Sequence, residues 1–80
     1  MSTFVKLRQI TKSPDRYIAF EYESNIYCSY SRTKVFPNVR WQSDELGESA
    51  IIEVLCNRGW HTTDIGDEFD EAHKQFQGAV

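Results

Sequence analysis

The sequence predicts an α+β domain, in which a three-stranded antiparallel sheet packs on one main helix and a short C-terminal helix follows. Residues 3–35 consist of alternating apolar and polar stretches separated by turn-forming residues, which is typical of antiparallel strands. Residues 44–58 instead place apolar side chains three and four positions apart, the spacing of one face of an α-helix. With 80 residues, the chain 1–80 is expected to form a single compact domain.

Three strands are expected in the first half of the chain, at Thr3–Ile10, Arg16–Glu23 and Ile26–Val35. Pro14, whose ring fixes one backbone torsion, predicts a tight turn between the first two. In the second strand the side chains alternate between two faces, with Ile18, Phe20 and Tyr22 on one and Tyr17, Ala19 and Glu21 on the other.

The third predicted strand is more polar and richer in tyrosine than a strand between two covered layers. One face of the sheet is therefore expected to be wet. An uncovered face or an open strand edge is protected most simply by a partner chain, so a homodimer is a reasonable expectation. The residues expected on this face are Tyr17, Tyr27, Ser29, Ser31 and Thr33.

The main helix is expected over residues 44–58, with Ser43 or Asp44 capping its N-terminus. Gly59 fits the left-handed residue just past a helix, and Trp60 is placed to fold back on the last turn, as in a Schellman ending. The apolar stripe that faces the sheet consists of Leu46, Ala50, Ile51, Val54 and Leu55.

The remaining segments connect or follow these elements. Phe36–Gln42 is expected to be a surface connection, because Phe36 is held extended by the following proline. His61–Ile65 is either a short fourth strand, weakly favoured by its two threonines, or a loop. A second helix is expected over residues 67–77, opened by Asp67 with Asp70 three positions later in the manner of a capping box.

The net charge of −3 hides an asymmetry between the halves. Residues 1–40 carry seven bases and three acids, whereas residues 41–80 carry two bases and nine acids. A molecule with two oppositely charged faces is expected, and its field would steer charged partners. The longest apolar run has four residues and the N-terminus lacks the apolar core of a signal peptide, so a cytoplasmic protein is expected.

Nothing in the sequence predicts catalysis or a cofactor. Cys28 and Cys56 lack metal-binding spacing and are expected to be reduced thiols. Asp70 and His73 would share one helix face, but a carboxylate di-metal site needs two such motifs with further glutamates. Because no nucleophile elbow or glycine-rich phosphate loop is present either, no enzyme activity and no metal site are expected.

Two surfaces are candidates for binding. The first is acidic, and its acids could imitate the charges of a nucleic-acid backbone and so occupy a basic groove on a nucleic-acid enzyme. Nine acids lie on or beside the two expected helices, and capping and solvation also explain at least half of the nine, since most are expected in first helical turns. The residues of this surface are Asp67, Glu68, Asp70 and Glu71.

The second surface combines aromatic residues with arginines, the types that anchor protein interfaces. The same residues could stack bases and neutralise phosphates of single-stranded nucleic acid. A pI of about 5.2 is opposite to the basic footprint of a nucleic-acid binder, so a protein partner fits better. The residues of this surface are Tyr27, Tyr30, Arg32, Arg40 and Trp41.

In size and charge the chain resembles phage-encoded inhibitors of host machinery, among them many anti-CRISPR proteins. That resemblance implies a partner such as a nucleic-acid-handling complex. The sequence thus predicts a small non-enzymatic module that binds and inhibits another macromolecule through protein–protein contacts, and the alternative is a single-stranded nucleic-acid-binding domain.

Overall fold

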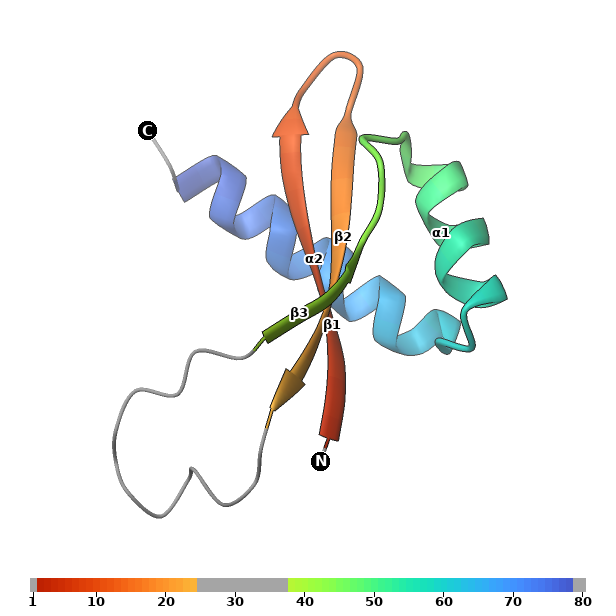
Figure 1. The fold of residues 1–80 in the computed structure, drawn as a ribbon. Coiled ribbons are helices and arrows are strands. Elements are labelled where there is room, and N and C mark those ends of the chain that lie inside the picture. The colour runs from red at the N-terminus through yellow and green to blue at the C-terminus, as the bar shows by residue number, and fades with distance from the viewer. Residues whose placement is uncertain (1, 25–37, 79–80) are drawn as a thin grey trace.

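The computed structural model describes residues 2–24 and 38–78 of the chain (Figure 1). The three strands form one antiparallel sheet in the order β1-β2-β3, which confirms the predicted α+β class. The elements in chain order are β1 (Ser2–Thr11), β2 (Arg16–Ser24), β3 (Asn38–Gln42), α1 (Glu48–Asn57) and α2 (Thr62–Gly78).

Strands β1 and β2 form a long hairpin whose turn contains Pro14, as predicted. Alternate residues of both strands face the core, because successive side chains of a strand point to opposite faces. We call this side the inner face. It consists of the directly opposite pairs Val5–Glu21, Leu7–Ala19 and Gln9–Tyr17, all of which are buried.

The strand predicted at Ile26–Val35 lies outside the described residues. The segment Asn38–Gln42, which we expected to be part of a surface connection, is instead strand β3 and pairs with β2. Trp41 lies opposite Glu21, with an irregularity in the register next to this pair. Apart from Trp41 the residues of β3 are exposed, so this edge strand has no alternation of buried and exposed positions that a sequence pattern could reveal.

Helix α1 begins at Glu48, four residues later than predicted, and its N-cap residue makes no side-chain hydrogen bond. The expected caps, Ser43 and Asp44, both precede the helix. Leu46 exchanges two backbone hydrogen bonds with Tyr17, at 2.8 and 2.9 Å, so the segment before α1 continues along β2. The prediction of a side-chain cap was wrong because the segment that contains Ser43 and Asp44 runs beside the sheet and ends before the helix begins.

The end of α1 has the predicted Schellman geometry. Gly59 has a φ of 98°, in the left-handed region that glycine tolerates best. Its amide donates to the carbonyl of Cys56 and the amide of Trp60 donates to that of Leu55, both at 3.0 Å. These are the two hydrogen bonds that define the motif.

Helix α2 begins at Thr62, so the predictions of a strand or loop at His61–Ile65 and of a helix start at Asp67 were wrong. The physical reason is burial: Ile65 continues the apolar stripe of Phe69 and Ala72 toward the N-terminus by one more turn. With 17 residues against 10, α2 is also longer than the helix that we expected to be the main one.

Both helices contribute to a single core against the inner face. Helix α1 packs mainly against β2, and α2 packs mainly against β1. In Figure 1, α2 crosses the hairpin with its N-terminal end near α1 and its C-terminal end beyond the opposite side. The core cluster consists of Val5, Leu7, Tyr17, Ala19, Ile51, Leu55, Ile65, Phe69 and Ala72.

Tyr17 is fully buried in this cluster, with 0% of its surface exposed. The expectation that it lies on a wet face was therefore wrong. Its hydroxyl group lies 2.7 Å from Nε2 of His73, which gives a buried phenol the polar partner that it needs.

Candidate functional site

The side of the sheet that faces away from the core is a candidate binding surface, which we call the outer face. Its residues alternate with the inner-face residues, and every strand residue of the core cluster belongs to the other side. All of them are half-buried or exposed, although five are apolar or aromatic. The outer face consists of Phe4, Lys6, Arg8, Ile18, Phe20, Tyr22, Val39 and Gln42.

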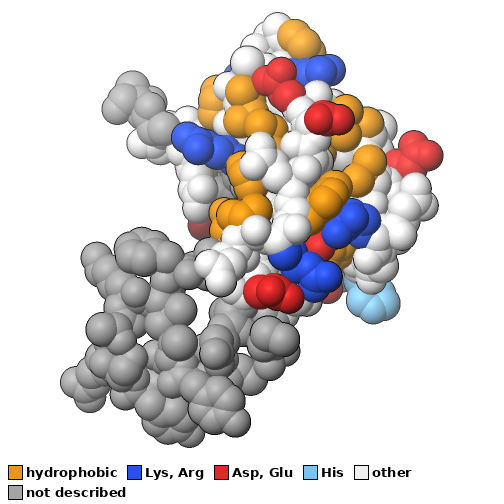
Figure 2. Space-filling model, in the orientation of Figure 1, with side chains coloured by type: hydrophobic (Ala, Val, Ile, Leu, Met, Phe, Trp, Pro, Cys, Tyr) orange, Lys and Arg blue, Asp and Glu red, His pale blue; other side chains and the backbone are white. Residues whose placement is uncertain are grey.

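Aromatic rings form the centre of the outer face. Phe4 lies directly opposite Tyr22, and their rings stack at 5.3 Å between centroids with an angle of 22° between planes. Phe20 also stacks against Tyr22, at 6.2 Å between centroids. Val39, opposite Tyr22 on β3, is 51% exposed. An apolar strip thus crosses all three strands, and Figure 2 shows hydrophobic side chains gathered over the strands with lysines and arginines beside them.

Two bases of β1 border this strip. Lys6 pairs across the hairpin with Phe20, and Arg8 pairs with Ile18. Nζ of Lys6 lies 3.7 Å from Oε1 of Glu68 on α2, so its charge bridges the strand and the helix.

A cavity of about 700 Å³ opens beside β1, and we call it the β1 groove. One wall is formed by Lys6–Gln9 of β1 together with Phe20 and Tyr22 of the outer face. The other wall is one side of α2, with the acids Glu68 and Glu71 and the apolar residues Ala72 and Phe76. The groove therefore joins the basic and the acidic parts of the molecule.

The predicted acidic surface lies on α2. Asp67, Asp70 and Glu71 are exposed and Glu68 is half-buried. Because α2 begins at Thr62, these four acids lie inside the helix, and capping of its N-terminus does not account for them. Burial raises the pKa of the Glu68 carboxyl above its usual value, and the negative charges of Glu71 and Asp67 raise it further, while Lys6 lowers it.

Only Arg40 and Trp41 of the predicted aromatic surface belong to the described residues, because Tyr27, Tyr30 and Arg32 lie outside them. Arg40 and Trp41 both contact other parts of the chain. The Arg40 guanidinium lies 3.9 Å from Glu21 and 3.8 Å from Glu23. Trp41 packs against the core, and the guanidinium carbon of Arg58 lies 4.0 Å from the centre of its ring.

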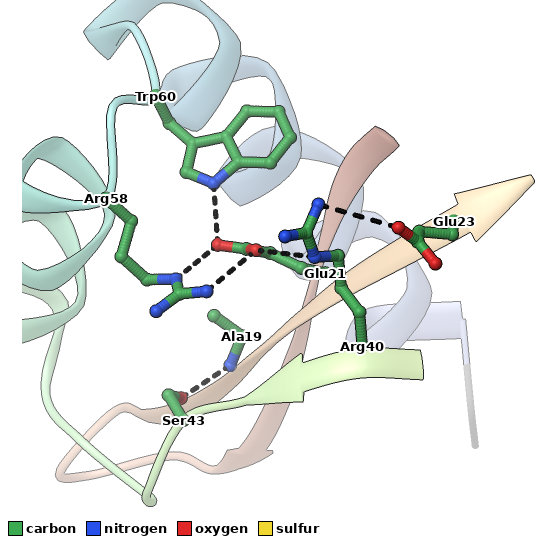
Figure 3. A network of polar contacts seen from close by, with 7 residues as sticks. All are labelled: Ala19, Glu21, Glu23, Arg40, Ser43, Arg58 and Trp60. Carbon is green, nitrogen blue, oxygen red and sulfur yellow. Dashed lines mark hydrogen bonds and ion pairs between the residues drawn. The ribbon is translucent and has the colours of Figure 1, made fainter. Parts of the chain in front are cut away.

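Sequence reasoning missed the polar centre of the molecule, the buried carboxylate of Glu21 (Figure 3). It accepts hydrogen bonds from two nitrogens of Arg58 and, at 2.9 Å, from the indole nitrogen of Trp60. These partners hold the pKa of Glu21 below its usual value, with the Arg58 hydrogen bond as the largest cause, although burial acts in the opposite direction. The sequence contains one indication of this buried acid, since Glu21 follows Tyr17 and Ala19 at every second position and therefore shares their face of the strand.

With its oxygens occupied by donors, Glu21 is arranged to stabilise the fold rather than to accept a proton from a substrate. Within residues 2–24 and 38–78, no buried side-chain nitrogen or oxygen lacks a hydrogen-bond partner. Among these described residues, no three His, Cys, Asp or Glu side chains are placed to hold a metal ion together.

The two histidines differ in environment. His61 is exposed. His73 contacts the Tyr17 hydroxyl, and burial, followed by the charges of Asp15 and Glu48, raises the pKa of that phenol. The thiol of Cys56 is exposed and free. None of the helices that the structure describes is long and apolar enough to cross a lipid bilayer.

No protein-family model matches the sequence, and neither a curated protein nor a solved structure matches it.

Proposed function

We propose that this chain is a small non-enzymatic module that binds another protein through its outer face and thereby inhibits it. The observation that carries the proposal is the apolar strip of Phe4, Phe20, Tyr22 and Val39, which crosses the sheet on the side away from the core. Aromatic residues beside a few charged ones are typical of the centres of protein interfaces. The inhibitor role is supported by the resemblance to phage inhibitors in size and charge.

Affinity capture with matched variants tests this proposal. The immobilised chain is incubated with nuclease-treated lysate, and captured proteins are identified by mass spectrometry. We expect the double variant Phe4→Ser/Val39→Ser to lose the proteins that the wild type retains, because it removes both ends of the strip. Glu53→Ser, an exposed position on α1, is the control and should retain them. Equal capture by all three chains would reject the outer face as the binding surface.

A second function, binding of single-stranded nucleic acid, is supported by one specific arrangement. The rings of Phe4, Phe20 and Tyr22 lie on the same face as Lys6 and Arg8, so stacking and phosphate contacts are available together. The net charge of −3 and the acids of α2 beside Lys6 oppose it. A gel-shift assay with oligothymidine distinguishes the two, since only this second function predicts a shift that Arg8→Glu abolishes.

A further inference from the structure

We propose that the β1 groove binds an extended peptide segment of the partner protein, added as a strand along the edge of β1 that faces away from β2. Acidic side chains of that segment would face Lys6 and Arg8, and a basic side chain would face Glu68 and Glu71. This inference rests on the proposed function, since it specifies how and by what chemistry a protein partner is recognised.

The first argument is the position of β1 in the sheet. It is the terminal strand in the order β1-β2-β3, and in the described part of the chain no strand pairs with its other edge. An edge strand presents a row of backbone N–H and C=O groups that a partner strand can use. The groove is lined by the four consecutive residues Lys6–Gln9, whose side chains alternate between the two faces, and by Phe20 and Tyr22 of β2, so it follows β1 and extends onto the outer face.

The second argument is size. The cavity volume of about 700 Å³ lies within the range of roughly 300–1,000 Å³ that is usual for ligand pockets. Four residues of extended chain span roughly 13 Å at about 3.3 Å per residue. The groove therefore has room for a short extended segment and is too small for a folded domain.

The third argument is the charge of the two walls. A strand added to β1 alternates its side chains in phase with those of β1. The side chains next to Lys6 and Arg8 point toward the outer face, where acidic groups are favoured. The intervening side chains point toward α2, where they meet Ala72 and Phe76 and the carboxylates of Glu68 and Glu71. The favoured segment therefore alternates acidic residues with apolar or basic ones.

The environment of Glu68 supports a basic residue in the segment. Its carboxyl group is half-buried beside Lys6 at 3.7 Å, and this burial raises its pKa despite the lysine. An ammonium group from the partner would supply a second positive charge at this position.

Charge also distinguishes a peptide from other occupants. If two copies of this chain paired through β1 in antiparallel fashion about Leu7, Lys6 of each copy would lie opposite Arg8 of the other, and like charges directly opposite one another destabilise a sheet. A nucleic-acid strand in the groove would be repelled by Glu68 and Glu71. A peptide that alternates acidic and basic side chains places its acids near Lys6 and Arg8 and its base near Glu68 and Glu71.

A designed peptide tests the inference directly. The probe is a fluorescent octapeptide of sequence TEVEKEVT with blocked ends, and binding to the full chain is followed by anisotropy. We expect it to bind at least about tenfold more tightly than TKVKEKVT, in which the charges are exchanged. N-methylation of alternate backbone nitrogens of the peptide removes the hydrogen-bond donors along one of its edges. When the methylated edge is the one that faces β1, binding should weaken by about the same factor of ten.

A charge-exchange variant keeps the test independent of any loss of stability. Arg8→Glu/Glu71→Lys preserves the net charge and should reverse the preference, so that TKVKEKVT becomes the better ligand. Glu53→Lys, remote on α1, should leave the preference for TEVEKEVT unchanged. Equal binding of the two peptides to the wild type, an unreversed preference in the exchanged variant, or displacement of the probe by oligothymidine alone would overturn the inference.

The two proposals fail separately. Loss of captured lysate proteins in Phe4→Ser/Val39→Ser together with no peptide preference would leave the outer-face function intact and reject the groove, since neither substituted residue lines it. A clear charge-dependent peptide preference without such loss would place recognition in the groove alone.

Discussion

The indole nitrogen of Trp60 donates a hydrogen bond of 2.9 Å to the carboxylate of Glu21, although the two residues are 39 positions apart in the sequence. Arg58 donates to the same carboxylate from the end of α1, and Arg40 lies near it from β3. Glu21 thereby contacts three segments of the chain, namely the end of α1, the connection to α2 and strand β3. The connection between α1 and α2 is attached to the middle of the sheet at this one buried group (Figure 3).

Replacing Trp60 by Phe tests this contact. The ring remains, but Glu21 loses a donor, so the pKa of Glu21 should rise and the free energy of unfolding should fall by about 1.5–3 kcal/mol, the usual value for a hydrogen bond to a charged group. Urea unfolding and a carboxyl NMR titration measure both quantities. Trp41→Phe is the control, because it keeps an aromatic ring beneath Arg58 and should leave the pKa of Glu21 unchanged.

The stability of the protein should depend on pH through Glu21. Its pKa in the folded state is lower than in the unfolded chain, whose reference value is 4.5. The stabilisation is therefore fully present above about pH 4.5 and is lost as the pH falls through the lower folded-state pKa. Thermal unfolding between pH 7 and pH 2 should show this loss, and Glu21→Gln should be less stable at pH 7 with a shallower acid dependence. An equally steep dependence in Glu21→Gln would assign the slope to other carboxyls.

Tyr17→Phe should reduce the free energy of unfolding by about 0.5–1.5 kcal/mol, because it removes the buried hydrogen bond to His73 but keeps the ring in the core. Tyr22→Phe makes the same chemical change on the outer face and should alter stability by less than about 0.5 kcal/mol. Chemical denaturation of both variants at pH 7 gives the comparison. Equal effects would contradict the burial of the Tyr17 hydroxyl.

Two glycines should respond to alanine in opposite directions. Gly66 lies inside α2 with nothing within 4 Å of the position of an added methyl group, so Gly66→Ala should stabilise the protein by roughly 0.5–1 kcal/mol. Gly59 has a φ of 98°, so Gly59→Ala should destabilise it by about 1–2 kcal/mol. Both are measured by thermal unfolding. If α2 began at Asp67, as the sequence suggested, Gly66→Ala would bring no such gain.

The sequence predicted those parts of the fold in which a local pattern and the tertiary environment agree. The alternation in β2 correctly separated Tyr17, Ala19 and Glu21 from Ile18, Phe20 and Tyr22. Gly59 and Trp60 correctly marked the end of α1, because a Schellman motif depends on a few adjacent residues. Such features need no knowledge of distant contacts.

The errors occurred where distant contacts decide the structure. The first five residues of α2 include two threonines and a glycine, which are poor helix formers, and the burial of Ile65 beside Phe69 outweighs that local preference. Ser43 resembles a helix cap, but its hydroxyl accepts a hydrogen bond of 2.8 Å from the amide of Ala19 on β2. The pairing of β3 with β2 likewise depends on residues far apart in the chain.

The aromatic strip of the outer face likewise depends on contacts between residues that are distant in the sequence. The sequence placed the expected binding aromatics at Tyr27, Tyr30 and Trp41, of which only Trp41 lies within the described residues, and it did not single out Phe4 or Phe20. Only the register of the β1–β2 hairpin shows that Phe4 and Tyr22 lie opposite each other. No spacing rule in a single sequence specifies that pairing.

The position of Glu21 also bears on what each half of the chain can do alone. Glu21 is one of three acids in the basic half, and its buried charge is neutralised by Arg58, one of two bases in the acidic half. A fragment of residues 2–42 would lack every helical residue of the core as well as Arg58 and Trp60, so it would expose the apolar inner face and leave Glu21 without these donors. We therefore expect truncation before Arg58 to prevent autonomous folding of the sheet, and expect separately expressed halves to become ordered only when mixed.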